Sequence, residues 1–320
     1  MSTTTSLEKT RPAASAAAGG GGSWQRWQQK AAPYLFLSPF LILFCVFGIY
    51  PIFKSITLSL YATSGPKDIA PVGLGNYAYL LRDPDFHRAV ANTAVYAFWS
   101  IFLQLPLALG LAILLTQKWV AGKNIFRWAI FSPNLMGQVF VGVLFARIFM
   151  PQYGLLNRFL EWVTNGRIPA DTKWLNNPDL VMPALVITSL WLYVGFNMIY
   201  FLAALQGVDK ELYEAAHVDG ANALQQFQHV TLPGIKPVTV FVLITATIGS
   251  FQLFELPFLL LGGGGPDNRG LTIVMYLYQN GFNSGDLGFA AAVGWTLALG
   301  ILAISLLQMR MSGGFKAAGD

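Results

Sequence analysis

Side chains that could catalyse a reaction are scarce in this sequence. The single cysteine, Cys45, lies within an apolar run, so one chain can form neither a disulfide nor a cluster of thiolate ligands. The three histidines, His87, His217 and His229, are scattered, and no HExxH motif or Cys/His cluster is present. We therefore expect no metal site and no catalytic residues, which leaves hydrogen bonding as the chemistry to look for.

Polar side chains within long apolar runs are the first candidates for ligand binding, because lipid penalises such groups unless they face a cavity or a partner. Tyr193 and Asn197 are four residues apart, with Phe196 beside them, so they share one face of a helix. Gln252 and Glu255 are three residues apart and are expected to share a face of the next apolar run. Aromatic rings beside amide and carboxylate groups suit a ligand with hydroxyls and apolar faces. The alternative is that these groups bond to neighbouring helices.

A polar segment, residues 209–237, separates two of the apolar runs. Its stretch ELYEAAHVDGA can form a short helix, because Glu, Leu and Ala favour that conformation. Gly220 can end or redirect this helix, and Pro233 is expected to interrupt the hydrogen bonding of the next one. The segment therefore predicts a helix–turn–helix on the membrane surface that docks a partner.

The rest of the chain is dominated by apolar runs. Charged residues make up 11% of the 320 residues, whereas soluble domains contain about a quarter. A helix needs about 20 apolar residues to cross the hydrocarbon core of a bilayer. Six runs are long enough, and they lie within 34–61, 89–117, 128–146, 180–208, 237–261 and 287–309. Because these runs lack the alternation of barrel strands, we expect an all-α membrane protein with six transmembrane helices.

Lysine and arginine set the expected orientation in the membrane. They are more numerous in the two tails and in the second-to-third and fourth-to-fifth connections than in the other three connections, which places both termini in the cytoplasm. The net charge of +5 is too dispersed to indicate nucleic acid. We expect residues 1–33 to form a disordered cytoplasmic tail, 34–311 the membrane domain and 312–320 a short C-terminal tail.

The polar segment resembles the EAA loop of permease subunits of binding-protein-dependent ABC importers. The matching residues are Glu214, Ala215, Ala216, Asp219, Gly220, Leu232 and Pro233. Residues 37–60, 73–93 and 262–282 are similar to the opening span and two external connections of carbohydrate permeases of the maltose and glycerol-phosphate type. The resemblance covers about residues 34–311 and implies the type I permease fold.

This resemblance implies a set of partners in a bacterial or archaeal plasma membrane. A second permease subunit would complete a heterodimer, and an extracytoplasmic binding protein would deliver the sugar. Two ATPase subunits would hold ATP and Mg²⁺, so this chain would bind no cofactor. Glu214 would pair with a basic group on the ATPase, the alanines would allow close approach, and Gly220 would form the turn. The solute cavity would be lined by the spans that carry Tyr193, Phe196, Asn197, Gln252 and Glu255.

Three alternatives remain open. A permease of the same fold could import another solute, such as an amino acid, a peptide or phosphate. A secondary transporter or channel would work without an ATPase, and it should show inverted repeats or broken spans, neither of which is clear in the sequence. A membrane enzyme would need a nucleophile–base pair or a metal set, which the sequence does not show.

Overall fold

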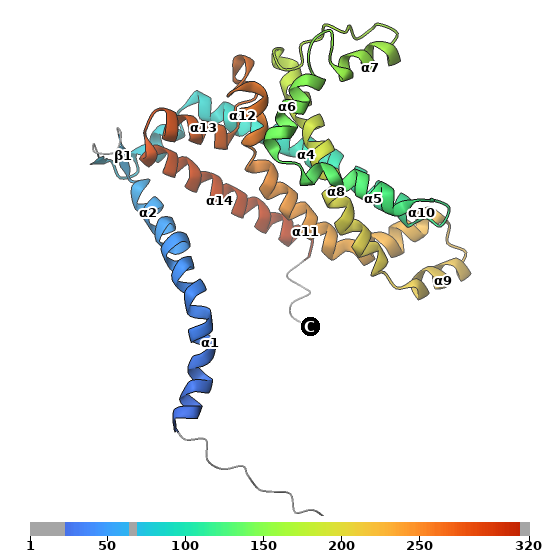
Figure 1. Ribbon diagram of the computed structural model, residues 1–320, viewed down its shortest axis with the longest axis horizontal. Coiled ribbons are helices and arrows are strands. Elements are labelled where there is room, and N and C mark those ends of the chain that lie inside the picture. Colours follow the sequence, from blue (N-terminus) through green and yellow to red (C-terminus); the bar gives the residue numbers. More distant parts are fainter. Residues whose placement is uncertain (1–22, 64–68, 314–320) are drawn as a thin grey trace, which may run out of the picture. The chain divides into compact units, whose positions relative to one another are not determined.

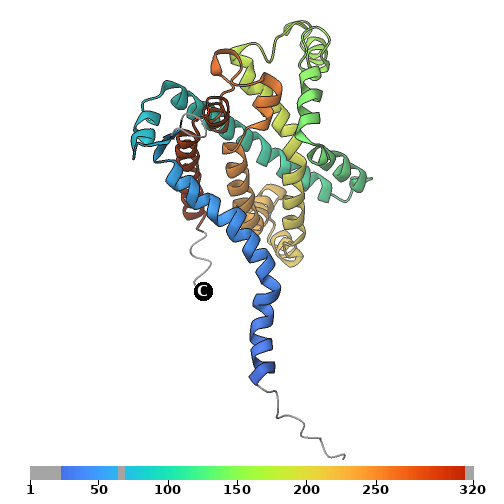
Figure 2. The same cartoon turned by 60° about the vertical axis from the view of Figure 1, so that its left-hand side comes forward.

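A computed structural model describes residues 23–63 and 69–313 (Figures 1 and 2). The chain divides after Lys54 into two units, and each is described by itself. The first apolar run forms α1 (Ser23–Phe44), a π-helical turn η1 (Cys45–Ile49) and α2 (Tyr50–Leu58). The prediction of a disordered tail is wrong for residues 23–33, which are helical. Residues 1–22 and 314–320 of the predicted tails lie outside the described residues.

The described residues of the second unit form helices and one short hairpin, in which Tyr61 pairs with Pro71. Its elements are β1 (Tyr61–Thr63), β2 (Ile69–Pro71), α3 (Gly75–Leu80), α4 (Pro84–Thr116), α5 (Lys123–Phe131), η2 (Ser132–Leu135), α6 (Gln138–Ile148), α7 (Leu155–Val163), α8 (Pro178–Gln206), α9 (Lys210–Val218), α10 (Ala223–Gln226), η3 (Phe227–Thr231), α11 (Leu232–Phe251), α12 (Glu255–Leu261), η4 (Pro266–Asn268), α13 (Ile273–Tyr278), η5 (Gln279–Asn283) and α14 (Leu287–Met311).

The helices account for the six predicted spans. In the described residues, five helices are long and apolar enough to cross a membrane, and a bent pair supplies the sixth. The third span, predicted over 128–146, is bent, because its two parts, 123–135 and 138–148, meet at 102°. Pro133 lies in the 3₁₀ turn η2, and Gly137 has extended backbone at the start of α6. A proline cannot donate to the helical ladder, so the helix breaks here.

The predicted fifth run, 237–261, is not one helix, because the continuous apolar helix there spans Ala223–Phe251 and the residues after it belong to a break and to α12. α11 ends at Phe251, and α12 begins at Glu255. In a continuous helix Pro257 would clash with the carbonyl of Leu253 and could not donate to it. That carbonyl instead accepts a 2.7 Å hydrogen bond from the buried Thr272 hydroxyl. Irregular backbone at membrane depth is tolerated when its polar groups are satisfied in this way.

α4 and α8 pack along each other, and α11 packs against both (Figure 2). Small residues allow this close packing, since Ala108, Ala112 and Ala184 are fully buried. Gly195 of α8 lies against the end of α5, where an added Cβ would be 1.9 Å from the carbonyl oxygen of Ile130. The bundle therefore fixes the inner faces of α4, α8 and α11 relative to one another.

The start of α4 is attached to α13 by a polar contact. Asp83 caps α4 by accepting from the backbone of Asp85, and it also accepts from the Tyr276 hydroxyl. Burial raises the pKa of the Tyr276 hydroxyl, and the hydrogen bond to Asp83 raises it further. The phenol therefore stays protonated and keeps donating to the carboxylate.

Candidate functional site

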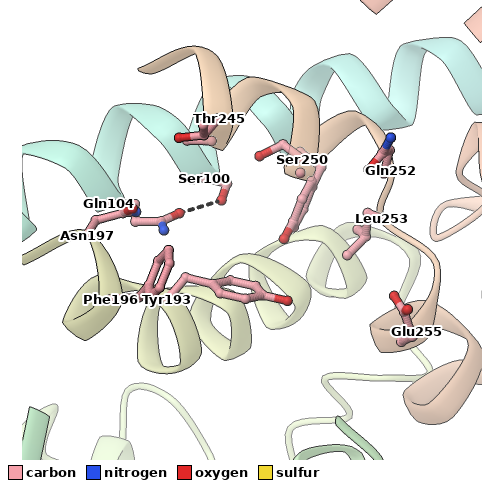
Figure 3. Close-up of a pocket in the computed structure, with 13 residues that line it drawn as sticks. Ser100, Gln104, Tyr193, Phe196, Asn197, Thr245, Ser250, Gln252, Leu253 and Glu255 are labelled. Atoms are coloured by element: carbon pink, nitrogen blue, oxygen red, sulfur yellow. Dashed lines mark hydrogen bonds between the residues drawn. The ribbon is translucent and has the colours of Figure 1, made fainter. Parts of the chain in front are cut away.

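A cavity of about 230 Å³ lies among α4, α8 and α11 (Figure 3). Its walls come from three helices and from the break that follows α11. The lining residues are Tyr96, Ser100, Gln104, Tyr193, Phe196, Asn197, Thr245, Ala246, Gly249, Ser250, Gln252, Leu253 and Glu255. The cavity wall is partly apolar and partly polar. It carries aromatic rings, hydroxyl groups, the amide groups of two glutamines and one asparagine, and one carboxylate.

All five side chains predicted from the sequence line this one cavity. Tyr193, Phe196 and Asn197 come from α8, where the four-residue spacing places the tyrosine and the asparagine on one face. The expected geometry of the other pair is wrong, because Gln252 directly follows α11 as its C-cap and Glu255 begins α12. The two share the cavity through the break between the helices and not through a common helix face (Figure 3).

The contribution of α4 was missed by the sequence reasoning. Tyr96, Ser100 and Gln104 lie four residues apart, so they form one stripe of α4, and all three line the cavity. Ser100 and Gln104 are labelled in Figure 3. That spacing in an uncharged run was a visible signal. Thr245 and Ser250 of α11 complete the polar lining. Thr245 and Ser250 are five residues apart, a spacing that does not place them on one helix face. Their position in the cavity follows only from the way α11 packs against α4 and α8.

Several polar groups of the cavity have no hydrogen-bond partner among the described residues. The Ser100 hydroxyl donates to Oε1 of Gln104 at 3.3 Å, and Nε2 of Gln138 donates to the Tyr193 hydroxyl at 3.4 Å. Across residues 23–63 and 69–313, the side chains of Asn197, Gln252 and Glu255 have no hydrogen-bond partner. These donors and acceptors are therefore available to a ligand.

The cavity can bind a polar ligand through hydroxyls, amides and one carboxylate. Glu255 is the one carboxylate among its lining residues, and no histidine or cysteine lines it. Within the described part of the chain, no group of three or more His, Cys, Asp or Glu side chains could hold a metal ion. Rings of Tyr193 and Phe196 beside amides and a carboxylate suit a polyhydroxylated ligand with apolar faces.

The polar segment forms the predicted helix–turn–helix. α9 begins at the cap Asp209 and ends in a turn, in which the amide of Gly220 donates to the carbonyl of His217 and that of Ala221 to Ala216. This pattern is a Schellman motif and needs a left-handed residue. Gly220 provides it with φ of +78°, and no atom lies within 4 Å of an added Cβ.

The predicted docking residues lie on the surface of this segment. Glu214, Ala215, Asp219 and Gly220 are exposed, and Ala216 is half-buried. Two apolar side chains of α9 are also exposed, Leu212 at 53% and Val218 at 86%. Together with Ala215 they are spaced three residues apart, which places them along one stripe. The Tyr213 hydroxyl lies 3.0 Å from that of Thr231 and holds α9 against the following helix.

One long helix leads from this turn to the cavity. It begins at Ala223, where the N-cap Asn222 and Gln225 of the first turn form a capping box, and it runs without a gap through η3 and α11 to Phe251. Leu232 and Pro233 therefore lie inside this helix, at the junction where η3 passes into α11. The π-helical turn η3 directly precedes them. The last turns of the helix form one wall of the cavity.

Known proteins match most of the chain. The family model described as "binding-protein-dependent transport system inner membrane component" matches residues 74–313. The arabinooligosaccharides transport system permease protein AraP of Bacillus subtilis is 42% identical over 294 residues, which cover 92% of each chain. The lactose transport system permease protein LacF of Rhizobium radiobacter is 35% identical, over 86% of this chain and 92% of that protein. A crystal structure of a bacterial ABC transporter involved in the import of the acidic polysaccharide alginate superposes with a TM-score of 0.76 at 25% identity, over 90% of this chain and 97% of that chain.

Proposed function

The chain belongs to the family of binding-protein-dependent transport system inner membrane components, and we propose that it is the permease subunit of an ATP-driven ABC importer for a carbohydrate. It is a multi-pass inner membrane protein. The observation that carries the substrate class is the cavity, in which Asn197, Gln252 and Glu255 lack partners within the described chain beside the rings of Tyr193 and Phe196. The arabinooligosaccharide and lactose permeases that resemble the chain support the same class.

The cavity binds the solute by hydrogen bonds and ring contacts. Carbohydrates present hydroxyls at their edges and apolar patches on their ring faces. The amides of Asn197 and Gln252 can donate and accept, whereas the carboxylate of Glu255 accepts only. The ring of Phe196 is 38% exposed and offers an apolar surface. The solute is a sugar, an oligosaccharide or a glycerol-phosphate-like compound, delivered by an extracytoplasmic binding protein.

The helix–turn–helix couples the cavity to a separate ATPase. In this proposal the exposed stripe of Leu212, Ala215 and Val218 docks on an ATPase subunit, and Glu214 pairs with a basic group there. ATP and Mg²⁺ are held by two ATPase subunits and not by this chain. A second permease subunit completes the pathway. ATP binding moves α9, and the helix from Ala223 to Phe251 carries the motion to the cavity wall.

The bent third span is a feature that an ATPase-independent transporter would also show. Such breaks were expected of a secondary transporter, but the family match and the exposed α9 distinguish this chain from that class. Uptake that continues when the partner ATPase is inactive would contradict the proposal. The same result would leave the hydrogen-bonding role of the cavity intact.

The role of Glu255 is tested by Glu255→Gln in proteoliposomes that hold the full transporter and its binding protein. A hydrogen bond to a charged group contributes about 1.5–3 kcal/mol, and about 1.4 kcal/mol corresponds to a tenfold change in binding. We expect the half-saturating sugar concentration to rise at least tenfold. Glu161→Gln, on the exposed side of α7, is the matched control and should leave it unchanged. Equal uptake by both variants would remove Glu255 from the binding site.

The coupling role of the turn is tested by two substitutions at Gly220. A β-branched residue with positive φ costs about 1–2 kcal/mol, so Gly220→Val should distort the end of α9. Asparagine tolerates this conformation, so Gly220→Asn should keep the turn. We expect the valine variant to reach the membrane but to lose uptake and co-purification with the ATPase, and the asparagine variant to retain most of both. Full uptake by the valine variant would refute the coupling role.

A further inference from the structure

The short helix α7 has an apolar face that no described part of the chain covers. Leu155, Phe159, Trp162 and Val163 are 74%, 57%, 77% and 53% exposed. With 3.6 residues per turn, these four side chains fall within an arc of about 100°. Such a continuous arc differs from the single scattered apolar residues that are normal on a protein surface.

The other sides of α7 have distinct surroundings. Leu156 and Leu160 pack against the core cluster of α6, α8 and α12, and Asn157 is fully buried. Arg158 and Glu161 form an exposed ion pair at 3.5 Å. The helix therefore has one side against the protein, one charged side and one exposed apolar side between them. This three-way division is what a helix lying along a membrane surface requires.

Asn157 and Gly154 hold α7 rigidly at the end of α6. The Asn157 amide donates to the carbonyl of Met150 at 3.2 Å and to that of Thr172 at 2.9 Å. Its carbonyl accepts from Nε1 of Trp174 at 2.6 Å. At Gly154 an added Cβ would lie 2.3 Å from a carbonyl oxygen of α6. The exposed arc of α7 thus has a fixed direction relative to α6.

The helix that leads to α7 also exposes apolar side chains. Val139, Phe140 and Val143 of α6 are 61%, 73% and 62% exposed, and α6 belongs to the bent pair that forms the third span. α7 follows the far end of α6 and lies at the end of the second unit away from α9 (Figures 1 and 2). A helix at this level lies where the hydrocarbon core meets water.

We propose that α7 is an interfacial anchor whose apolar arc inserts into the leaflet opposite the ATPase side. Trp162 lies where tryptophan is preferred in membrane proteins, at the boundary between acyl chains and headgroups. The ion pair of Arg158 and Glu161 faces the water. The bound partner is therefore lipid. This assignment depends on the membrane location of the chain and not on the identity of its solute.

Site-specific labels on neighbouring residues test the depth of each side of α7. The full transporter is reconstituted in nanodiscs after Cys45→Ser, which removes the single native thiol. A polarity-sensitive fluorophore is attached through Phe159→Cys or Trp162→Cys on the apolar arc. Arg158→Cys, on the charged side, is the matched control. Quenching by brominated lipid and by aqueous iodide is measured for each label.

The quenching pattern decides between lipid, water and protein. Labels at 159 and 162 should emit at shorter wavelength, lose intensity with brominated lipid and be protected from iodide, while the label at 158 shows the reverse. Strong iodide quenching at 159 and 162 would place the arc in water and overturn the proposal. Protection of both labels from lipid and iodide would overturn it too, because a protein partner would then cover the arc.

Discussion

Replacement of Gly195 by alanine should destabilise the bundle at the point where α5 meets α8. An added Cβ would lie 1.9 Å from the carbonyl oxygen and 2.6 Å from the carbonyl carbon of Ile130, and 2.9 Å from Cα of Phe131. Non-bonded heavy atoms are most stable at about 3.5–4.0 Å, so the two helices must separate by more than 1 Å. All three obstructing atoms belong to the backbone, which cannot rotate away.

The expected cost lies at the upper end of the range for overpacking. Inserting a methyl group into a packed core costs about 1–3 kcal/mol, and more where the backbone must shift. We expect roughly 3 kcal/mol for Gly195→Ala. The displacement also moves Tyr193 and Asn197, which lie two residues before and two residues after the glycine and line the cavity. Sugar uptake should fall even in the fraction of protein that remains folded.

Thermal unfolding of the purified protein in nanodiscs measures this effect. The matched control is Gly110→Ala on α4, where no atom lies within 4 Å of the added Cβ. Alanine is favoured over glycine in a helix by about 0.5–1 kcal/mol, so the control should be neutral or slightly more stable. Equal unfolding temperatures for the two variants would show that α5 and α8 do not meet at Gly195, and the packing argument would be refuted.

Two further predictions concern polar contacts outside the cavity. Burial and the hydrogen bond to Asp83 raise the pKa of Tyr276 above its ordinary value of 10.0. At a pH above 10.0 the folded protein therefore keeps a phenol proton that the unfolded chain loses. The free energy of unfolding that this proton contributes is fully present below pH 10.0 and declines as the pH rises above it. Tyr276→Phe should remove this part of the alkaline loss, as measured by thermal melts across the alkaline range; an unchanged pH profile would contradict it. Asn157→Leu leaves Nε1 of Trp174 unpaired and should cost about 1–3 kcal/mol per orphaned group. Arg158→Ala, which removes an exposed ion pair, should cost less than about 1 kcal/mol, and equal losses in the two melts would contradict the buried role of Asn157.

The apolar runs predicted the spans well because burial in lipid leaves a strong and local signal. The two breaks were harder to predict. Pro257 was visible, and its conflict with the carbonyl of Leu253 follows from covalent geometry. Whether a helix breaks or merely kinks there depends on a substitute donor, and that donor is Thr272, which is distant in the sequence. No local pattern indicates such a partner.

The cavity was predicted in part, and for one pair the reasoning was wrong. The α8 face of Tyr193 and Asn197 follows from helical spacing alone. Gln252 and Glu255 do line the cavity, but through a helix break in place of the assumed common face. Spacing can group residues within one helix, whereas the meeting of three helix faces depends on packing among residues far apart in the chain.

The irregular positions of the helix that leads to the cavity all lie in one half of it. In the helix from Ala223 to Phe251, the π-helical turn η3 and the prolines Pro233 and Pro237 all lie in the half next to the α9 turn. The cavity-lining half contains no proline and keeps its regular hydrogen bonds up to the break. Bending concentrates at prolines and π-helical turns, so a displacement of α9 should flex the first half and move the second as a rigid segment. The cavity wall then shifts as a whole and keeps its own geometry, as a pathway that alternates between two defined openings requires.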